Sequence, residues 1–278
     1  MIIVLSPHLD DAVLSLGAAI AGWVAEGHEV EVWTVYTAGP PLEEIPPAQR
    51  PFGDYATRRA EDEAALAMLG ARPRHLGVWE RIWREPPVRG VTGVFRTPPD
   101  VSGFARLDEV RAIVAEALAR PGAGVYAPLG VGGHVDHVEL ALATWRAMED
   151  EGGQRRVTFY EDFYALSERA RQRHPVTVRA PRALRDSPGL AVPAGLPALG
   201  ALGAVGRGPT LERYAPAVAT TPWRADVVPV RGFEDVKLRA VAAYRSQAAL
   251  LGPLARSLPR VLRRQHERRG GEPVWRLG

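Results

Sequence analysis

The chain opens with an apolar segment that ends in a cluster of polar side chains, and this arrangement constrains the fold most. The segment Ile2–Leu5 predicts a buried strand, and His8, Asp10 and Asp11 follow it within a few residues. Apolar residues at helical spacing then continue over Ala12–Ala25. A strand, a polar turn and a helix in this order are typical of α/β proteins, in which ligands bind beyond the carboxyl ends of the strands.

The same alternation of strand and helix patterns continues along the chain. We expect an α/β fold with a Rossmann-like, doubly wound and mainly parallel sheet, as one domain over residues 1–278 with a C-terminal excursion. Further strands are expected at Glu29–Tyr36, Arg74–Gly77, Gly124–Ala127, Arg156–Tyr160 and Asp226–Val230. Further helices are expected at Thr57–Leu69, Leu107–Ala119, His134–Met148 and Asp235–Leu251. Irregular inserts are expected near residues 80–103 and 180–210.

The composition restricts the chemistry. The chain has no cysteine, which excludes disulfides, thiolate metal sites and cysteine nucleophiles, so that histidines and carboxylates would have to hold any metal. The formal net charge is only +3, and the basic excess lies late, over Arg256–Arg269. The preferred interpretation of this segment is a solvated helix face, with an anionic membrane surface or nucleic acid as the alternative.

The hydrophobicity of the chain predicts its cellular location. No stretch approaches the ~20 apolar residues that a membrane-spanning helix needs, so we expect no stable membrane insertion. The N-terminal segment lacks a basic region before its apolar run, and Asp10 and Asp11 interrupt that run, which argues against a signal peptide. We therefore expect a cytoplasmic protein with no nucleic-acid partner. The oligomeric state stays open, a homo-oligomer included.

The first polar cluster contains two adjacent carboxylates. Asp10 and Asp11 repel each other unless a cation or hydrogen bonds hold them, and together with His8 they are ligand types that zinc accepts. The alternative is structural: either aspartate can cap the following helix, and His8 can bond a backbone carbonyl. A strand that ends in two aspartates is also how phosphoryl-accepting domains hold magnesium.

A second cluster lies some 120 residues later. His134 and His137 are three residues apart, so at the start of a helix they lie on one face, with Asp136 between them. The cluster follows a strand pattern and a glycine-rich loop, which lets the backbone approach a ligand closely. A surface or capping role is the alternative for these residues. Two such clusters suggest one site at one edge of the sheet.

With both clusters quoted, the chain resembles the PIG-L/LmbE-like family of zinc-dependent N-deacetylases. The first family motif reads [AS]-H-P-D-D-E, and SPHLDDA keeps His8, Asp10 and Asp11 with Leu9 for proline and Ala12 for glutamate. The second motif reads G-H-x-D-H, which GHVDH at 133–137 matches fully. Weaker family features are seen at Arg58, Glu61, Ala64, Leu69 and Gly70, at Tyr160–Asp162, and at Lys237, Tyr244, Ser246 and Gln247.

The resemblance implies an LmbE-like fold and a hydrolase that removes the acetyl group from an N-acetylglucosamine-type amide, releasing acetate and a free amine. It implies one Zn²⁺ per chain, for which other divalent metals can substitute, and a small N-acetylated sugar conjugate as partner: a thiol-precursor glycoside, an antibiotic or another conjugate. The implied zinc ligands are His8, Asp11 and His137. The implied catalytic residues are Asp10, as general base, and His134, which stabilises the tetrahedral intermediate or acts as acid.

The resemblance also implies supporting roles. Asp136 would orient one of the imidazoles, and Arg58 and Glu80 are the expected substrate-binding residues. For Arg58 the alternative is a salt bridge on a helix surface with Glu61 or Asp62. Some family members have a tyrosine where this chain has Gly132, so the contribution of that tyrosine is absent or comes from elsewhere.

Two other functions compete with this one. A magnesium-dependent phosphotransfer domain would use Asp10 or Asp11 together with a lysine late in the sheet, and Lys237, the one lysine of the chain, is expected on a helix. A non-catalytic carbohydrate- or nucleotide-binding module on the same fold is the second alternative, since fold alone does not decide function.

Overall fold

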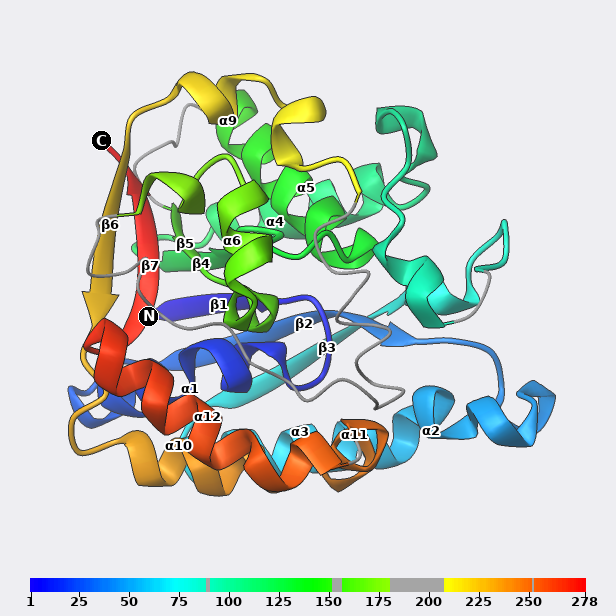
Figure 1. Cartoon of the computed structure of the whole chain (residues 1–278), viewed down its shortest axis with the longest axis horizontal. Coiled ribbons are helices and arrows are strands. Elements are labelled where there is room, and N and C mark those ends of the chain that lie inside the picture. The colour runs from blue at the N-terminus through cyan, green and yellow to red at the C-terminus, as the bar shows by residue number, and fades with distance from the viewer. Residues whose placement is uncertain (89–90, 152–156, 181–207, 252) are drawn as a thin grey trace.

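The computed structural model describes residues 1–88, 91–151, 157–180, 208–251 and 253–278. Within these ranges seven strands form one sheet in the order β3-β2-β1-β4-β5-β7-β6 (Figure 1). The strands are β1 (Ile2–Ser6), β2 (Val30–Ala38), β3 (Arg72–Trp79), β4 (Gly124–Pro128), β5 (Val157–Tyr160), β6 (Trp223–Val228) and β7 (Glu272–Leu277). The α-helices are α1 (Asp11–Ala25), α2 (Arg50–Gly53), α3 (Tyr55–Leu69), α4 (Leu107–Leu118), α5 (Val135–Glu151), α6 (Glu168–Arg173), α9 (Ala217–Thr220), α10 (Glu234–Val241), α11 (Arg245–Leu251) and α12 (Pro253–Arg269).

The first five strands run parallel to one another. Strand β1 pairs with β2 on one side and with β4 on the other, and β3 and β5 extend the sheet outward. The order 3-2-1-4-5 is that of a doubly wound sheet, in which the direction of winding reverses between β1 and β4. The predicted Rossmann-like, mainly parallel fold is confirmed. Its reversal point, where such sheets bind ligands, lies between the two strands that precede the polar clusters.

Helices cover both faces of the sheet (Figure 1), and alternating side chains of the strands pack into two cores. In β1, Ile3 and Leu5 belong to the core that includes α4 and α5. Ile2 and Val4 belong to the opposite core, with α1, α3 and α10. Because the strands are buried on both faces, their near-continuous apolar runs are the signature of a central parallel sheet.

The C-terminal part adds an antiparallel edge to this sheet. Strand β7 pairs antiparallel with both β5 and β6. The strand expected at Asp226–Val230 is found three residues earlier, as β6, and its partner β7 was not anticipated. No helix within the described ranges has both the length and the apolar character that a membrane span requires.

One predicted helix differs from the structure. The helix expected over Asp235–Leu251 is interrupted after Val241 and resumes at Arg245, so that it forms α10 and α11. The insert near 80–103 holds only short 3-10 helices, η3 (Arg81–Trp83), η4 (Val91–Phe95) and η5 (Val101–Gly103). The second insert, near 180–210, falls mainly on residues 181–207, which lie outside the described ranges.

Candidate metal centre

The two polar clusters meet because their strands are neighbours. The loop after β1 leads into α1 at Asp11, and the glycine-rich loop after β4 leads into α5 at Val135. Gly130 has a φ of 78°, and a Cβ there would lie 3.2 Å from the Cα of Val138, so only glycine allows this approach of loop to helix. Since β1 and β4 are parallel, both loops leave the sheet at the same edge.

Three donor atoms converge at this edge. His8 Nδ1 lies 3.0 Å from Asp11 Oδ2, and His137 Nε2 lies 3.1 Å from the same oxygen. The two ring nitrogens are 3.3 Å apart. Ligands of a tetrahedral zinc with bonds of ~2.0–2.2 Å stand roughly 3.3–3.5 Å from one another, so the three atoms fit one metal ion. His134 also has a ring nitrogen within 4.8 Å of those of His8 and His137.

Each of the two converging histidines has a carboxylate behind it. His8 Nε2 is 3.0 Å from Asp136 Oδ2, and His137 Nδ1 is 2.6 Å from Asp162 Oδ1. Carboxylates in this position fix the tautomer and the ring orientation of metal-binding histidines. The sequence pattern pointed to Asp136 but assigned no such position to Asp162, whose only signal was the fragment Tyr160–Asp162. The second oxygen of Asp162 accepts a hydrogen bond from Val131 N at 2.9 Å, which ties the carboxylate to the β4 loop.

Asp136 is part of a larger buried ion cluster that the sequence did not reveal. Arg84 lies directly after η3 and binds both Asp136 Oδ1 and Glu139 Oε2, the latter at 2.7 Å. The backbone N–H of Arg81 donates to Asp136 Oδ2 at 2.9 Å. Tyr36 OH donates to Glu139 Oε2 at 2.9 Å. The segment expected to be an irregular insert thus contributes a charged group directly behind the metal centre.

The charges of the cluster set the protonation of the converging groups. Burial alone would lower the pKa of His137, but the Asp11 and Asp162 carboxylates outweigh it and raise that pKa to about 9. Burial would raise the pKa of Asp11, and the positive charge of His137 and His8 instead holds it far below its ordinary range. A deprotonated carboxylate between two imidazoles that attract positive charge is an arrangement that a divalent cation satisfies well.

His134 lies in a different environment. Burial, with the neighbouring His8 adding to it, holds the pKa of His134 well below its ordinary value, so its ring is neutral. Its Nδ1 accepts a hydrogen bond from the backbone N–H of Asp136 at 3.3 Å, which leaves the hydrogen on Nε2. The aromatic rings of Phe95 and Tyr164 pack beside it, with centroids at 5.3 and 6.1 Å.

Asp10 has an unusual backbone and a free carboxylate. Its φ is 138°, the one positive value for a residue other than glycine in the described ranges, and its side chain makes no capping hydrogen bond to α1. Non-glycine residues adopt such conformations at a cost and mostly at functional sites. Burial and the adjacent Asp11 raise the pKa of Asp10, while the nearby Arg58 opposes the shift.

The two residues expected to bind substrate pair with each other. Arg58 Nη1 donates to Glu80 Oε1 at 2.7 Å and to Phe52 O at 2.8 Å, and both side chains are buried. The alternative of a surface salt bridge between Arg58 and Glu61 or Asp62 is therefore wrong. Burial would lower the pKa of His8, but its hydrogen bonds to Asp11 and Asp136 outweigh burial and raise that pKa. The charge of Glu80 adds to the rise, which places the Arg58–Glu80 pair within electrostatic reach of the converging donors.

The first turns of α1 are stabilised by a side chain of β7, near the other end of the chain. The helix is interrupted at Leu16, with φ −125° and ψ 15°, and the N–H groups of Ala18 and Ala19 donate to the carboxylate of Glu272 at 3.1 and 2.7 Å. Lys237 Nζ donates to the same carboxylate at 2.6 Å. The last strand therefore supports the helix that begins with Asp11.

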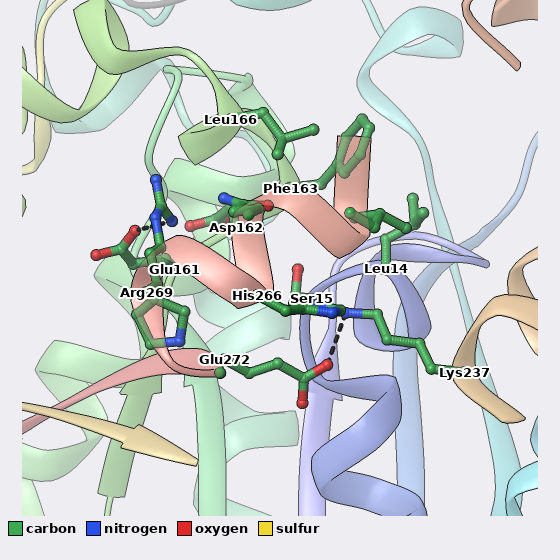
Figure 2. A pocket seen from close by; sticks show the side chains of 14 residues that line it. Leu14, Ser15, Glu161, Asp162, Phe163, Leu166, Lys237, His266, Arg269 and Glu272 are labelled. Atoms are coloured by element: carbon green, nitrogen blue, oxygen red, sulfur yellow. Dashed lines mark hydrogen bonds and ion pairs between the residues drawn. The ribbon is translucent and has the colours of Figure 1, made fainter. Parts of the chain in front are cut away.

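A small pocket lies beside this support (Figure 2). It measures about 20 Å³, enough for roughly one water molecule. Asp162 lines it and also faces His137, so the pocket adjoins the metal centre from behind. Its other labelled walls are Leu14 and Ser15 of α1, Glu161, Phe163 and Leu166 after β5, Lys237 of α10, His266 and Arg269 of α12, and Glu272 of β7.

Comparisons with known proteins agree with this geometry. The family described as PIG-L: GlcNAc-PI de-N-acetylase matches residues 3–148. A deacetylase from Thermobispora bispora that is named for 1D-myo-inositol 2-acetamido-2-deoxy-alpha-D-glucopyranoside is 37% identical over 154 residues, 51% of this chain and 49% of that relative. Its namesake from Saccharomonospora viridis is 30% identical over 259 residues, 88% of this chain and 84% of that relative.

Solved structures give the same result. The zinc-inhibited form of a teicoplanin deacetylase has a TM-score of 0.65 at 27% identity, with 99% of this chain and 96% of that chain covered. The chain spans about half the length of two of the curated relatives that it matches. The family model matches more than half of the chain, and the Saccharomonospora viridis relative is 30% identical over 88% of it, so the chain belongs to the PIG-L (GlcNAc-PI de-N-acetylase) family.

Proposed function

We propose that the protein is a zinc-dependent N-deacetylase that hydrolyses the acetamide of an N-acetylglucosamine-type conjugate. The observation that carries the proposal is the convergence of His8 Nδ1, Asp11 Oδ2 and His137 Nε2 within 3.0–3.3 Å, with a carboxylate behind each imidazole. Relatives named for an N-acetylglucosaminyl inositol and for teicoplanin support this substrate class. His8, Asp11 and His137 would hold one zinc ion.

The chemistry of such a site divides between the metal and the side chains. Bound zinc supplies a Lewis acid that polarises a carbonyl and lowers the pKa of water to about 7. Asp10 lies next to the ligand Asp11 and has no capping bond to hold it, so it can take a proton from the attacking water. Neutral His134 presents Nε2–H, which can donate to the acetyl oxygen as that oxygen becomes negative.

The remaining steps complete the hydrolysis. Hydroxide adds to the acetyl carbon, and the tetrahedral intermediate loses the amine as its carbon–nitrogen bond breaks. The nitrogen takes the proton that Asp10 accepted, which returns Asp10 to its carboxylate form and gives acetic acid and a primary amine. The proton of the acid then passes to the amine, which leaves acetate and an alkylammonium ion. The rings of Phe95 and Tyr164 beside His134 limit the access of bulk water to this face.

The magnesium-dependent phosphotransfer alternative finds no support in the position of Lys237. Its side chain is buried in an ion pair with Glu272, so its charge is already paired with a different carboxylate from Asp10 or Asp11 (Figure 2).

Metal analysis tests the proposal directly. We expect about one zinc per chain in the wild-type protein and none in His137→Ala, because that variant removes one of three ligands. His28→Ala is the matched control, since His28 is half exposed and lies outside the cluster; it should retain its zinc. Acetate release from N-acetylated sugar conjugates should follow the zinc content.

Two results would contradict the proposal. A wild-type protein that takes up no zinc would show that the three donors do not form a metal site. A zinc-loaded protein that releases acetate from no N-acetylated sugar would favour a carbohydrate-binding module on the same fold.

A further inference from the structure

The ion cluster around Arg84 has no part in the chemistry described above. Arg84, Asp136 and Glu139 have side-chain exposures of 5%, 0% and 0%, so this guanidinium is desolvated between two buried carboxylates. Its planar fork places one nitrogen on each carboxylate, which a lysine ammonium cannot do in the same geometry. Removing such a charged group from water has a desolvation cost, which is offset only where the geometry of the ion pairs and hydrogen bonds is good.

The hydrogen bonds at Asp136 leave little freedom to His8. Asp136 Oδ1 accepts from Arg84, and Oδ2 accepts from the backbone N–H of Arg81. An aspartate held ionised by an arginine only accepts hydrogen bonds, so His8 Nε2 must be the donor in its 3.0 Å contact with Oδ2. Nε2 of His8 therefore carries a hydrogen toward Asp136, and Nδ1 is the nitrogen that points to Asp11 and His137 and would serve as the metal ligand.

The two carboxylates depend on Arg84 to different degrees. Glu139 keeps two other donors, Tyr36 OH at 2.9 Å and the backbone N–H of Arg106 at 2.9 Å. Among the residues that the structure describes, Arg84 is the one hydrogen-bond partner of Asp136 Oδ1. Loss of the guanidinium would leave that oxygen without its hydrogen-bond donor and would remove one of the contacts that orient the Asp136 carboxylate. The carboxylate would then hold His8 Nε2 less firmly.

From this geometry we infer that Arg84 is a positioning residue for the metal centre. It holds Asp136 as an oriented acceptor, fixes His8 with Nδ1 free, and so sets the affinity of the site for zinc. The inference rests on the proposed zinc site and adds to it a residue from the segment 80–103, outside both sequence motifs.

Zinc affinity measured by competition with a chromophoric chelator tests the inference. We expect Arg84→Gln to bind zinc about 10–100-fold more weakly than the wild type, the usual effect of removing an outer partner of a metal ligand. Arg84→Lys keeps the charge and should recover part of that loss. Glu139→Gln is the matched control, because it removes the other arm of the fork and leaves the contact with Asp136; its affinity should stay close to wild type.

A double variant separates positioning from charge balance. Arg84→Gln alone leaves two buried carboxylates without a cation and can fail to fold. Arg84→Gln with Glu139→Gln removes one charge of each sign, and circular dichroism would confirm that it folds. The double variant should still bind zinc weakly, because nothing restores the donor to Asp136 Oδ1.

The outcomes are distinct. Wild-type affinity in the double variant would show that Arg84 only neutralises charge, and wild-type affinity in Arg84→Gln would show that it does not act on the site at all; either result overturns the inference. A wild-type protein without measurable zinc binding would instead overturn the proposed function, whatever the variants do.

Discussion

Asp10 combines a strained backbone with a side chain that makes no capping hydrogen bond to α1. Its neighbour Asp11 faces two imidazoles, whereas Asp10 has neither a ring partner nor a capping bond within the described residues. The backbone of Asp10 has a φ of 138°, and this turn separates the two consecutive aspartates. Two adjacent carboxylates in one short loop can therefore have different roles. The strain is consistent with a catalytic role for Asp10 and a ligand role for Asp11.

The substitution Asp10→Asn tests this division. We expect the variant to keep about one zinc per chain and to lose about 10²–10⁴-fold in kcat, the usual contribution of a general base. Zinc analysis and initial rates of acetate release check both halves of the expectation. Near-wild-type turnover would remove Asp10 from the mechanism, and loss of zinc would make it a ligand.

His174 is a buried histidine outside the metal centre that responds to acid. Its Nε2 lies 3.0 Å from Leu129 O, and its Nδ1 accepts from Val176 N at 3.3 Å, so the ring must be neutral to make both bonds. Burial lowers its pKa from 6.5 to about 4, against the opposing effect of the Leu129 carbonyl. Because the folded pKa is the lower one, the stabilisation is complete above pH 6.5 and is lost as the pH falls toward 4.

Denaturant unfolding at several pH values measures this effect. Between pH 6.5 and pH 5 the wild type should lose about 2 kcal/mol of unfolding free energy more than His174→Gln, which cannot be protonated and keeps a donor for Leu129. The comparison cancels the other titrating groups. Equal pH dependence in the two proteins would show that His174 is protonated without cost.

Whether a site residue could be recognised from the sequence depends on how far away its partners lie along the chain. His8, Asp10 and Asp11, and the second group around His137, are recognisable because each cluster is short and follows a strand pattern. Asp162 and Arg84 are not, because their partners are 25 and 52 residues away and only the folded sheet brings them together. A lone aspartate after a strand or an arginine in an irregular segment carries no local signal.

Helix α1 depends on an interaction that no helical pattern encodes. The interruption at Leu16 frees the N–H groups of Ala18 and Ala19, and a carboxylate from β7 accepts both. Lys237 balances the charge of that carboxylate with an exposure of 1% for each side chain. The helix thus has an internal cap, supplied by another element.

Glu272→Gln should destabilise the protein by about 3–5 kcal/mol, since it leaves the Lys237 charge buried without its partner. Urea unfolding measures the change. Adding Lys237→Met, which keeps the aliphatic chain and removes the charge, should recover a large part of the loss. A Glu272→Gln variant as stable as the wild type would show that the pair contributes nothing to stability.

The pattern of elements was predicted better than their ends and interruptions. The helix expected over residues 235–251 breaks because Tyr244 OH donates to Asp62 at 2.7 Å and Ser246 bonds Glu61 on α3. These contacts stabilise the turn between the two helical stretches, and the apolar periodicity of the sequence does not reveal them. Strand β7 was missed because its position is set by pairing with β5 and β6 rather than by its own six residues.

The candidate metal centre joins segments from across the molecule. The proposed ligands and their carboxylate partners come from the β1–α1 loop, from α5 and from the segment after β5, which pack against opposite cores of the sheet. We propose that the whole described chain acts as one domain, because these ties cross it from residue 8 to residue 272. A ligand that binds only the folded state then stabilises all of it at once.

Removal of zinc should therefore lower the unfolding free energy of the whole protein. At a free zinc concentration a thousandfold above Kd, binding contributes about 4 kcal/mol, which a strong chelator should abolish. Thermal unfolding of the wild type with and without chelator measures the difference, and His137→Ala should unfold at the same temperature in both conditions. Identical midpoints for the wild type would contradict a structural coupling between metal and fold.

The contacts of the Glu272 carboxylate imply that helix α1 reaches its final structure only late in synthesis. Asp11 is synthesised long before Glu272, yet the interrupted helix that carries it lacks its internal cap until residue 272 has been made and β7 has entered the sheet. A nascent chain that stops short of β7 would hold both sequence motifs and still lack a firmly placed Asp11. We therefore expect the candidate metal centre to bind a metal firmly only after β7 has joined the sheet.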